Sequence, residues 1–308
     1  MRRVGYAAIC EGLRVEHGGS GYVPAATRAG LAQSLRNIER ILWYNHRHGI
    51  RMYRMSSAIA PSITHPARPE RHRQVHQARR ELARVGALAR AWDIRLSFHP
   101  DQFVVLNSPS AAVVERSVAD LAWQAAVLDA MGQPLSAKVV VHTGGVYGQR
   151  DRSAARFVEA CRRLPETVRR RLALENDEWS YDVWDVLEIS RAAGGLPVVY
   201  DHFHHVTYGA PPDEDPAEPL AAAAATWTPA DGTPKIHYSS PQPGGRRGQH
   251  GYWIDLPEFE AFYRRTRHLE YDIMVEARSK DLSALAVMEV VRRVDREAGA
   301  APGRASGR

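Results

Sequence analysis

Six short apolar stretches of the sequence end in a histidine, an aspartate or a glutamate. Their length and their bulky side chains are typical of buried β-strands. The six terminal residues are His99, His142, Glu175, Asp201, His237 and Glu276. A carboxylate at the end of a buried strand is unfavourable unless a cation meets it, and imidazoles and carboxylates are ligands of divalent metals. The pattern therefore predicts a metal cluster, with Glu175 as a bridging ligand that helps the ions to activate water.

The rest of the chain supplies the elements that must bring these strand ends together. Apolar periodicity predicts a first strand at residues 4–9, a second at 51–57, and eight helices that alternate with eight strands. The helices include long ones at about 27–48 and 70–92, and shorter ones at about 153–164, 181–193 and 256–267. A Gly-rich loop is expected at 18–21 and a Pro-rich surface loop at 211–219.

Strands and helices alternating over 308 residues predict a single-domain (β/α)8 TIM barrel rather than an open doubly wound sheet. No GxGxxG motif follows the first strand, which removes the main reason to expect a dinucleotide fold. We expect the domain to span residues 1–298 and residues 299–308 to form a disordered tail. In a TIM barrel the carboxyl ends of all strands meet at one face, so the six residues would converge.

Composition and charge narrow the classes of protein further. The formal net charge is +6, which suits a polyanionic partner without requiring one. No apolar run is long enough for a signal peptide or a membrane span, so we expect a cytoplasmic protein with no membrane association. Cys10 and Cys161 form no CxxC pair, which argues against a disulfide framework or a cysteine zinc site.

The histidines outside the six strand ends differ in how well their positions suit metal binding. His65, His204 and His250 lie in segments expected on the same face of the barrel and are further candidate ligands. His202 and His205 are better explained as spacers, or as partners that orient a ligand. The other histidines lie among charged residues of expected helices and loops: His17, His46, His48, His72, His76 and His268.

Seven motifs in this order resemble those of one family, the UV damage endonucleases. They are Tyr53-Arg-Met-Ser-Ser57, Ser97-Phe-His-Pro-Asp-Gln-Phe-Val-Val-Leu-Asn107, His142-Thr-Gly-Gly-Val-Tyr-Gly148, Leu174-Glu-Asn-Asp177, Asp201-His-Phe-His-His205, Lys235-Ile-His-Tyr-Ser239 and Met274-Val-Glu276. The resemblance extends from about residue 4 to residue 290. It implies a TIM barrel related in architecture to endonuclease IV, with up to three divalent metals, most often Mn²⁺ and alternatively Mg²⁺, Zn²⁺ or Co²⁺.

The resemblance also implies roles for individual residues. The family's metal ligands fall on His65, His99, His142, Glu175, Asp201, His204, His237, His250 and Glu276. Its lesion-probing residues fall on Tyr6, Gln102 and Phe103, which we expect on loops over the site. A lysine that can be carboxylated near the metals falls on Lys235.

The expected reaction is hydrolysis of the phosphodiester bond immediately 5′ of a UV photoproduct, either a cyclobutane pyrimidine dimer or a 6-4 photoproduct. The partner would be UV-damaged double-stranded DNA in the cytoplasm, associated with the nucleoid, and the protein would act as a monomer without an obligate protein partner. Two alternatives remain open. A metal-dependent sugar isomerase or epimerase uses similar ligands on the same barrel, and a basic nucleic-acid-binding module would need no cluster of ligands.

Lys235 is unusual in this sequence. Only three of the 41 Lys and Arg residues are lysine, namely Lys138, Lys235 and Lys280. Because Lys235 lies two residues before His237 on an expected strand, both side chains should face the metals. An ammonium would be repelled there, whereas a neutral amine can take up carbon dioxide and become a metal-facing carbamate, which arginine cannot do.

Overall fold

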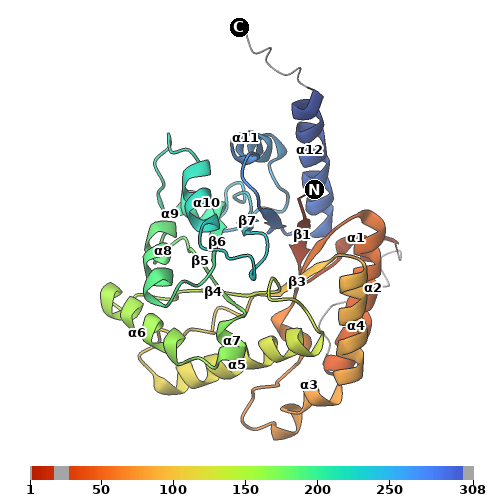
Figure 1. Cartoon of the computed structure of the whole chain (residues 1–308), viewed down its shortest axis with the longest axis vertical. Helices are drawn as coiled ribbons and strands as arrows, with labels where there is room; N and C mark the ends of the chain where they lie inside the picture. The colour runs from red at the N-terminus through yellow and green to blue at the C-terminus, as the bar shows by residue number, and fades with distance from the viewer. Residues whose placement is uncertain (1, 17–27, 301–308) are drawn as a thin grey trace.

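The computed structural model describes residues 2–16 and 28–300 and shows a closed barrel of eight parallel strands surrounded by helices (Figure 1). The strands pair in chain order, and β1 closes against β8. The strands are β1 (Val4–Ala7), β2 (Met52–Met55), β3 (Arg95–Phe98), β4 (Val139–His142), β5 (Leu172–Glu175), β6 (Val198–Asp201), β7 (Lys235–Tyr238) and β8 (Asp272–Val275). The predicted single-domain (β/α)8 barrel is confirmed.

Helices and short 3-10 turns connect successive strands and cover the outside of the barrel (Figure 1). They are α1 (Glu11–Glu16), α2 (Leu31–His48), η1 (Ser57–Ile59), η2 (Pro69–Arg71), α3 (Gln74–Gln77), α4 (Arg79–Ala91), α5 (Ala111–Ala130), α6 (Arg150–Arg163), α7 (Glu166–Arg169), α8 (Val183–Ala192), α9 (His202–Tyr208), α10 (Ala217–Ala224), α11 (Leu256–Thr266) and α12 (Asp281–Ala300). None of these helices is long and apolar enough to cross a membrane.

Several predicted boundaries are wrong. The helix expected at 70–92 is divided into η2, α3 and α4. Gln74, the first residue of α3, is buried and accepts from the Leu31 N–H (3.1 Å) while donating to the Pro61 carbonyl (3.1 Å). The Pro-rich loop ends early, since Pro219 lies in the first turn of α10. Helix α12 continues through Gly299 and Ala300, which were expected in the tail. The Gly-rich loop at 18–21, the predicted helix start at Thr27 and the tail at 301–308 lie outside the described residues.

Alternating side chains divide each strand into positions that face the interior of the barrel and positions that face the helices. Val140, Ala173 and Val199 form a small cluster that is separate from the main core and has Trp227 packed against it. Their neighbours Val139, Val141, Leu172 and Leu174 belong to the large core between barrel and helices. Two residues after each member of the small cluster come His142, Glu175 and Asp201, which therefore also face the interior.

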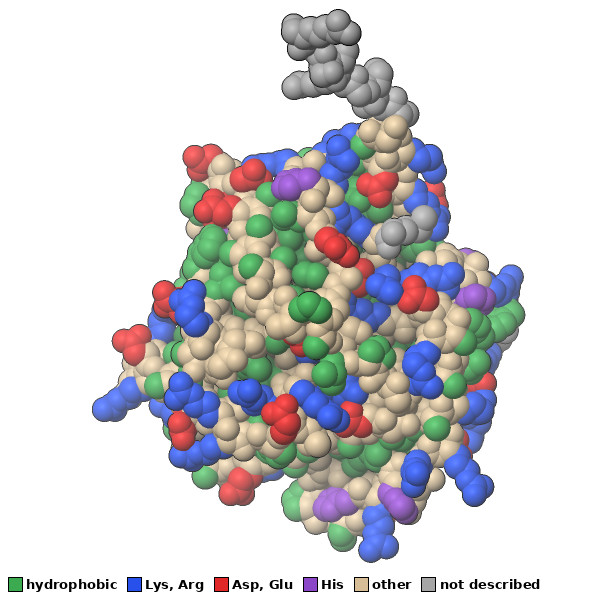
Figure 2. All heavy atoms as spheres, viewed as in Figure 1, with side chains coloured by type: hydrophobic (Ala, Val, Ile, Leu, Met, Phe, Trp, Pro, Cys, Tyr) green, Lys and Arg blue, Asp and Glu red, His purple; other side chains and the backbone are tan. Residues whose placement is uncertain are grey.

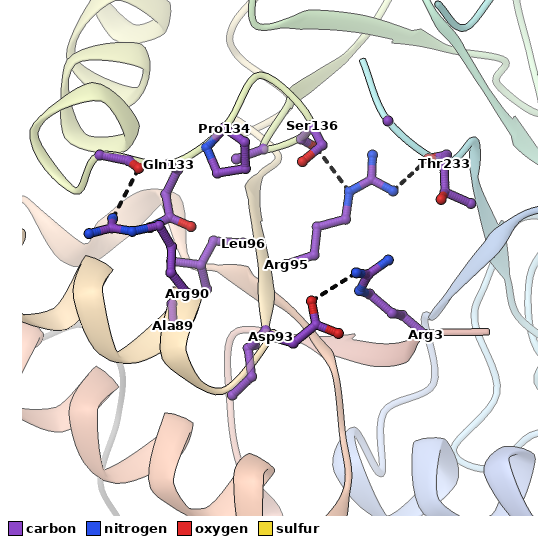
Figure 3. Close-up of a pocket in the computed structure, with 14 residues that line it drawn as sticks. Arg3, Ala89, Arg90, Asp93, Arg95, Leu96, Gln133, Pro134, Ser136 and Thr233 are labelled. Carbon is purple, nitrogen blue, oxygen red and sulfur yellow. Dashed lines mark hydrogen bonds and ion pairs between the residues drawn. The ribbon is translucent and has the colours of Figure 1, made fainter. Parts of the chain in front are cut away.

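The opposite end of the barrel, where the strands begin, carries a buried ion pair and one that is largely exposed. Arg95 on β3 lies 2.9 Å from Asp272 on β8, and its guanidinium also donates to the carbonyls of Ser136 and Thr233 (Figure 3). Arg3 pairs with Asp93 at the same end (2.8 Å). A cavity of about 510 Å³ lies here, lined in part by Arg3, Asp93, Arg95, Ser136 and Thr233. Since the candidate ligands lie at the other ends of the strands, this cavity is not part of the metal site.

Candidate metal centre

Glu175, the last residue of β5, is the centre of the cluster and is fully buried. His237 Nδ1 lies 2.8 Å from its Oε1 atom, and His99 Nε2 lies 2.9 Å from its Oε2 atom. His99 follows β3 and His237 belongs to β7, so three strands that are not adjacent meet at one carboxylate. Such convergence requires a closed barrel.

Strand register places the remaining ligands around Glu175. His142 is the direct partner of Glu175 in the β4–β5 ladder, and its Nε2 atom lies 3.9 Å from Glu175 Oε2. Asp201 is in turn the direct partner of His237 in the β6–β7 ladder. Neighbouring ligands in sequence order are therefore neighbours in the barrel.

The start of α9 adds His204 to the cluster. Asp201 is the N-cap of this helix and accepts a hydrogen bond from the His204 N–H at 2.8 Å, which turns the histidine back toward the barrel. His204 Nδ1 lies 3.7 Å from Glu175 Oε1 and 3.1 Å from the Asn176 carbonyl. The Asn176 side chain pairs with the backbone of Asp201 in both directions, at 2.9 and 2.8 Å.

Glu276, which follows β8, adds a second glutamate to the cluster around Glu175. Its Oε1 atom lies 3.1 Å from His237 Nδ1, and it forms an ion pair with Arg54 from β2. His250 lies next to Glu276, with its Nδ1 atom 2.9 Å from the Glu276 carbonyl and 3.8 Å from Oε2. The His250 ring centroid is also 5.8 Å from that of His204.

The donor set fits divalent metals. Three groups each present ligand atoms within 4.8 Å of one another, and Glu175 belongs to all three: His99–His142–Glu175, Glu175–His237–Glu276 and Glu175–Asp201–His204. Three buried polar atoms of these ligands have no hydrogen-bond partner within the described residues, namely His142 Nδ1, Asp201 Oδ2 and His237 Nε2. Unpaired buried donors and acceptors are costly in a native protein unless a further group binds them.

Burial and neighbouring charges shift the pKa values of Glu175, His237 and His142 in the direction that favours metal binding. Burial opposes ionisation of Glu175, but His237 and His142 hold its pKa well below the ordinary value. Burial lowers the pKa of His237 to about 4 and also lowers that of His142, so both imidazoles keep a free lone pair at neutral pH. Strongly perturbed groups gathered in one site are typical of functional sites.

Burial and nearby charges also shift the pKa values of Asp201, His204 and Lys235. Burial raises the pKa of Asp201 well above its ordinary value. Burial lowers the pKa of His204, but the charges of Asp201 and Glu175 outweigh it and raise the value to about 9. Burial, with Arg95 and Arg54, lowers the pKa of Lys235 to about 7. The Lys235 Nζ atom has no hydrogen-bond partner within the described residues.

Four other histidine, glutamine and phenylalanine residues considered in the sequence lie outside the three ligand groups. His65 is exposed on a turn between η1 and η2, where its Nδ1 atom accepts from the Ala67 N–H, and it belongs to none of the three groups. Gln102 and Phe103 lie on the loop after β3 and are exposed, Phe103 by 77%. His205 turns away from the cluster and pairs with Glu214 at 2.5 Å.

The expectation that Tyr6 lies on a loop over the site is wrong. Tyr6 is within β1 and is fully buried in the core between barrel and helices. Its hydroxyl donates to the Asn45 side chain of α2 at 2.9 Å. Alternation along β1 decides this, because Gly5 and Ala7 take the interior positions and Tyr6 takes the helix side.

Sequence reasoning missed two residues that hold ligands in place, Arg54 and Asn176. Asn176 follows Glu175 directly, and its pairing with Asp201 joins two adjacent strand ends. Arg54 is two residues after the buried Met52 of β2, so the alternation of the strand was the available signal.

Comparison with known proteins agrees with this geometry. The family model described as UV-endonuclease UvdE matches residues 27–301. The chain belongs to the UvdE family. A UV DNA damage endonuclease of Bacillus velezensis is 34% identical over 282 residues, which cover 89% of this chain and 85% of the relative. One from Bacillus cereus is 32% identical over 276 residues, covering 88% and 85%.

Solved structures place the UvdE chain in a wider group of barrels. The crystal structure of SacUVDE matches with a TM-score of 0.84 and 29% identity, covering 96% of this chain and 99% of that one. An L-ribulose 3-epimerase structure matches with a TM-score of 0.60 and 16% identity over the full length of both chains. The second likeness shows the fold alone. The chain is therefore a member of a DNA-damage endonuclease family, and the sugar isomerase alternative is not favoured.

Proposed function

We propose that this protein hydrolyses the DNA backbone immediately 5′ of UV photoproducts. The observation that carries the proposal is the set of three ligand groups that share Glu175 at the mouth of the barrel, in a chain of the UvdE family. Cyclobutane pyrimidine dimers and 6-4 photoproducts are the expected lesions. UV-damaged duplex DNA is the partner, and the protein works as a monomer in the cytoplasm at the nucleoid.

The residues that would hold the metals are those at the strand ends, with His65 and His250 as further ligands from loops. They are His65, His99, His142, Glu175, Asp201, His204, His237, His250 and Glu276. Divalent ions bound there, with Mn²⁺ the expected ion, supply a nucleophile from water at neutral pH and offset charge on the departing 3′ oxygen.

The chain itself positions the ligands. Backbone carbonyls contact the Nδ1 atoms of His99, His204 and His250, at 3.0 Å from Pro100 O, 3.1 Å from Asn176 O and 2.9 Å from Glu276 O. Such contacts orient imidazole ligands. Arg54 holds the carboxylate of Glu276 in its ionised form, since its charge opposes the effect of burial on the pKa of that group. Gln102 and Phe103 would fill the space left when the damaged bases leave the stack.

Nicking of supercoiled plasmid tests the proposal. Irradiated plasmid should be converted to the relaxed form, and unirradiated plasmid should stay supercoiled. A duplex with one defined photodimer should then be cut immediately 5′ of the lesion, leaving a 3′-hydroxyl and a 5′-phosphate, and a chelator should abolish cutting. Equal cutting of both plasmids would contradict lesion specificity, and turnover of a ketose without nicking would favour the epimerase alternative.

A further inference from the structure

Exposed aromatic side chains gather on the loops that surround the candidate metal centre. Five of the seven exposed aromatic residues in the described part of the chain lie on loops that follow strands β3, β4, β5 and β7. They are Phe103, Tyr147, Trp179, Tyr252 and Trp253, and the remaining two, Trp43 and Trp184, lie on helices α2 and α8. Exposed aromatic surface is costly to leave in water, so its concentration on one face indicates a binding surface.

Trp179 is the best-supported residue of this surface. It is 60% exposed, and the Arg247 guanidinium carbon lies 4.6 Å from the centroid of its ring. Arg247 is itself fixed, because its NH2 group donates to the carbonyls of Glu178 (3.0 Å), Thr207 (2.8 Å) and Tyr208 (3.3 Å). The indole therefore has one face supported by a held cation and a large part of its surface open to solvent.

The backbone around Trp179 is also held in position. The Asp177 side chain accepts hydrogen bonds from the N–H groups of Trp179 (2.8 Å) and Ser180. Gly248, beside Arg247, has a positive φ of 75°, and a Cβ atom there would lie 2.7 Å from Glu178 Oε1. The loops after β5 and β7 therefore lie in contact, and the positive φ at Gly248 favours glycine there.

Trp179 is directly connected to the candidate metal centre. Its neighbour Glu178 places Oε2 3.7 Å from His204 Nε2. A ligand stacked on Trp179 would therefore lie at the edge of the cluster, next to the loops that carry the other exposed aromatic residues.

We propose that Trp179, supported by Arg247, is a stacking platform for an unpaired base of the damaged duplex. The inference rests on the proposed function and adds a second aromatic contact to that of Phe103. A duplex opened at a photoproduct exposes the flat faces of bases, and aromatic side chains bind such faces regardless of sequence. The arginine adds a cation on the far face of the indole, as in other nucleic-acid contacts that combine stacking with positive charge.

Trp43 provides a matched control within the same chain. It is 47% exposed and has the Arg47 guanidinium carbon at the same distance, 4.6 Å, from its ring centroid, but it lies on the outer helix α2. Trp43→Ala removes an equivalent exposed Trp–Arg pair away from the metal centre. It should leave binding and nicking unchanged.

The test compares equilibrium binding of a photodimer duplex and of the matching undamaged duplex. Trp179→Ala should weaken binding to the damaged duplex by about tenfold or more, the size expected for loss of one stacked base, with little change for the undamaged one. Trp179→Phe should restore most of the lost affinity, and Trp179→Leu should not. The thermal unfolding midpoint should be the same in all variants because the side chain is exposed.

The outcomes separate this inference from the proposed function. A wild-type protein that neither discriminates nor nicks irradiated DNA overturns both. A discriminating wild type with an unchanged Trp179→Ala variant overturns the stacking role alone. Equal loss on both duplexes, or full rescue by Trp179→Leu, also overturns it, because either result describes an ordinary apolar contact rather than stacking on an exposed base.

Discussion

Glu175 belongs to all three ligand groups, so a single substitution at this residue affects every candidate metal position. We expect Glu175→Gln to fold and to lose nicking by several orders of magnitude, because an amide lacks the negative charge that would help to hold clustered cations. The measurements are nicking of irradiated plasmid and metal content by elemental mass spectrometry.

Glu260→Gln is the control for this substitution. Glu260 is a carboxylate on α11 that pairs with Arg264 (2.7 Å) and Arg293 (2.5 Å) and belongs to none of the three ligand groups. This variant should nick as wild type. Near-normal nicking and full metal content in Glu175→Gln would show that the ligand assignment is wrong.

Gln102 and Phe103 are exposed on the loop after β3, where they are free to contact DNA. Replacing both by alanine should reduce the ratio of affinities for damaged and undamaged duplex, since contacts with phosphates do not depend on the lesion. Competition binding with both duplexes at one salt concentration measures this ratio. If both affinities fall by the same factor, the two residues are general DNA contacts.

Lys235 is a buried amine whose Nζ atom has no hydrogen-bond partner within the described residues. We expect Lys235→Arg to lower nicking by about 100-fold, because a larger guanidinium displaces neighbouring ligands and small displacements in an active site are costly. Nuclear magnetic resonance with ¹³C-bicarbonate should show a carbamate signal in the wild type and none in the variant.

A second buried lysine, Lys138, provides the control for the carbamate measurement on Lys235. Lys138 is paired with Asp231 at the opposite end of the barrel. The carbamate signal should therefore survive Lys138→Arg. Unchanged nicking by Lys235→Arg would show that the amine has no special role.

At the scale of elements, the beginnings of β1, β3 and β8 are joined by Asp272. Its carboxylate contacts the buried Arg95 guanidinium at 2.9 Å and accepts from the Arg3 N–H at 3.1 Å. Asp272→Asn leaves the Arg95 charge buried without its partner, so the free energy of unfolding should fall by about 3–5 kcal/mol. Chemical denaturation measures the change.

An exposed ion pair provides the control for the loss of stability expected in Asp272→Asn. Glu159 and Arg163 lie 2.6 Å apart on α6, with both side chains more than half exposed. Glu159→Gln should cost no more than about 0.5 kcal/mol. A similar small loss for Asp272→Asn would mean that the strand ends are held by packing rather than by this pair.

At the scale of the whole molecule, positive charge is distributed rather than concentrated. The net charge is +6, and on the face shown in Figure 2 the Lys and Arg side chains are spread widely among acidic and apolar ones. Binding to undamaged duplex should therefore be weak and should fall linearly on a plot of log affinity against log salt concentration. Titrations over a range of salt concentrations measure the slope.

The same titrations distinguish phosphate contacts from contacts with bases. Trp179→Ala removes no charge, so its salt slope should equal that of the wild type, whereas Arg247→Met should lower the slope if Arg247 also contacts a phosphate. A changed slope in Trp179→Ala would indicate that the loop has moved.

The sequence alone determined the fold class and most of the candidate centre. Strand periodicity and strand-to-helix alternation are local properties, and a barrel brings all strand carboxyl ends to one face. The six strand-end residues could therefore be assigned to one site without knowledge of any contact, and the structure places all six in the three groups that share Glu175.

Only the tertiary structure decided which side chains touch. The register between β4 and β5 pairs His142 with Glu175, and the contact between Tyr6 and Asn45 of α2 joins segments that are distant in sequence. The hydrogen bond between Gln74 and Leu31 and the support of Trp179 by Arg247 likewise depend on segments that are distant in sequence. Such contacts arise from long-range packing, to which local propensity contributes nothing, and that is why these features became visible only in the folded chain.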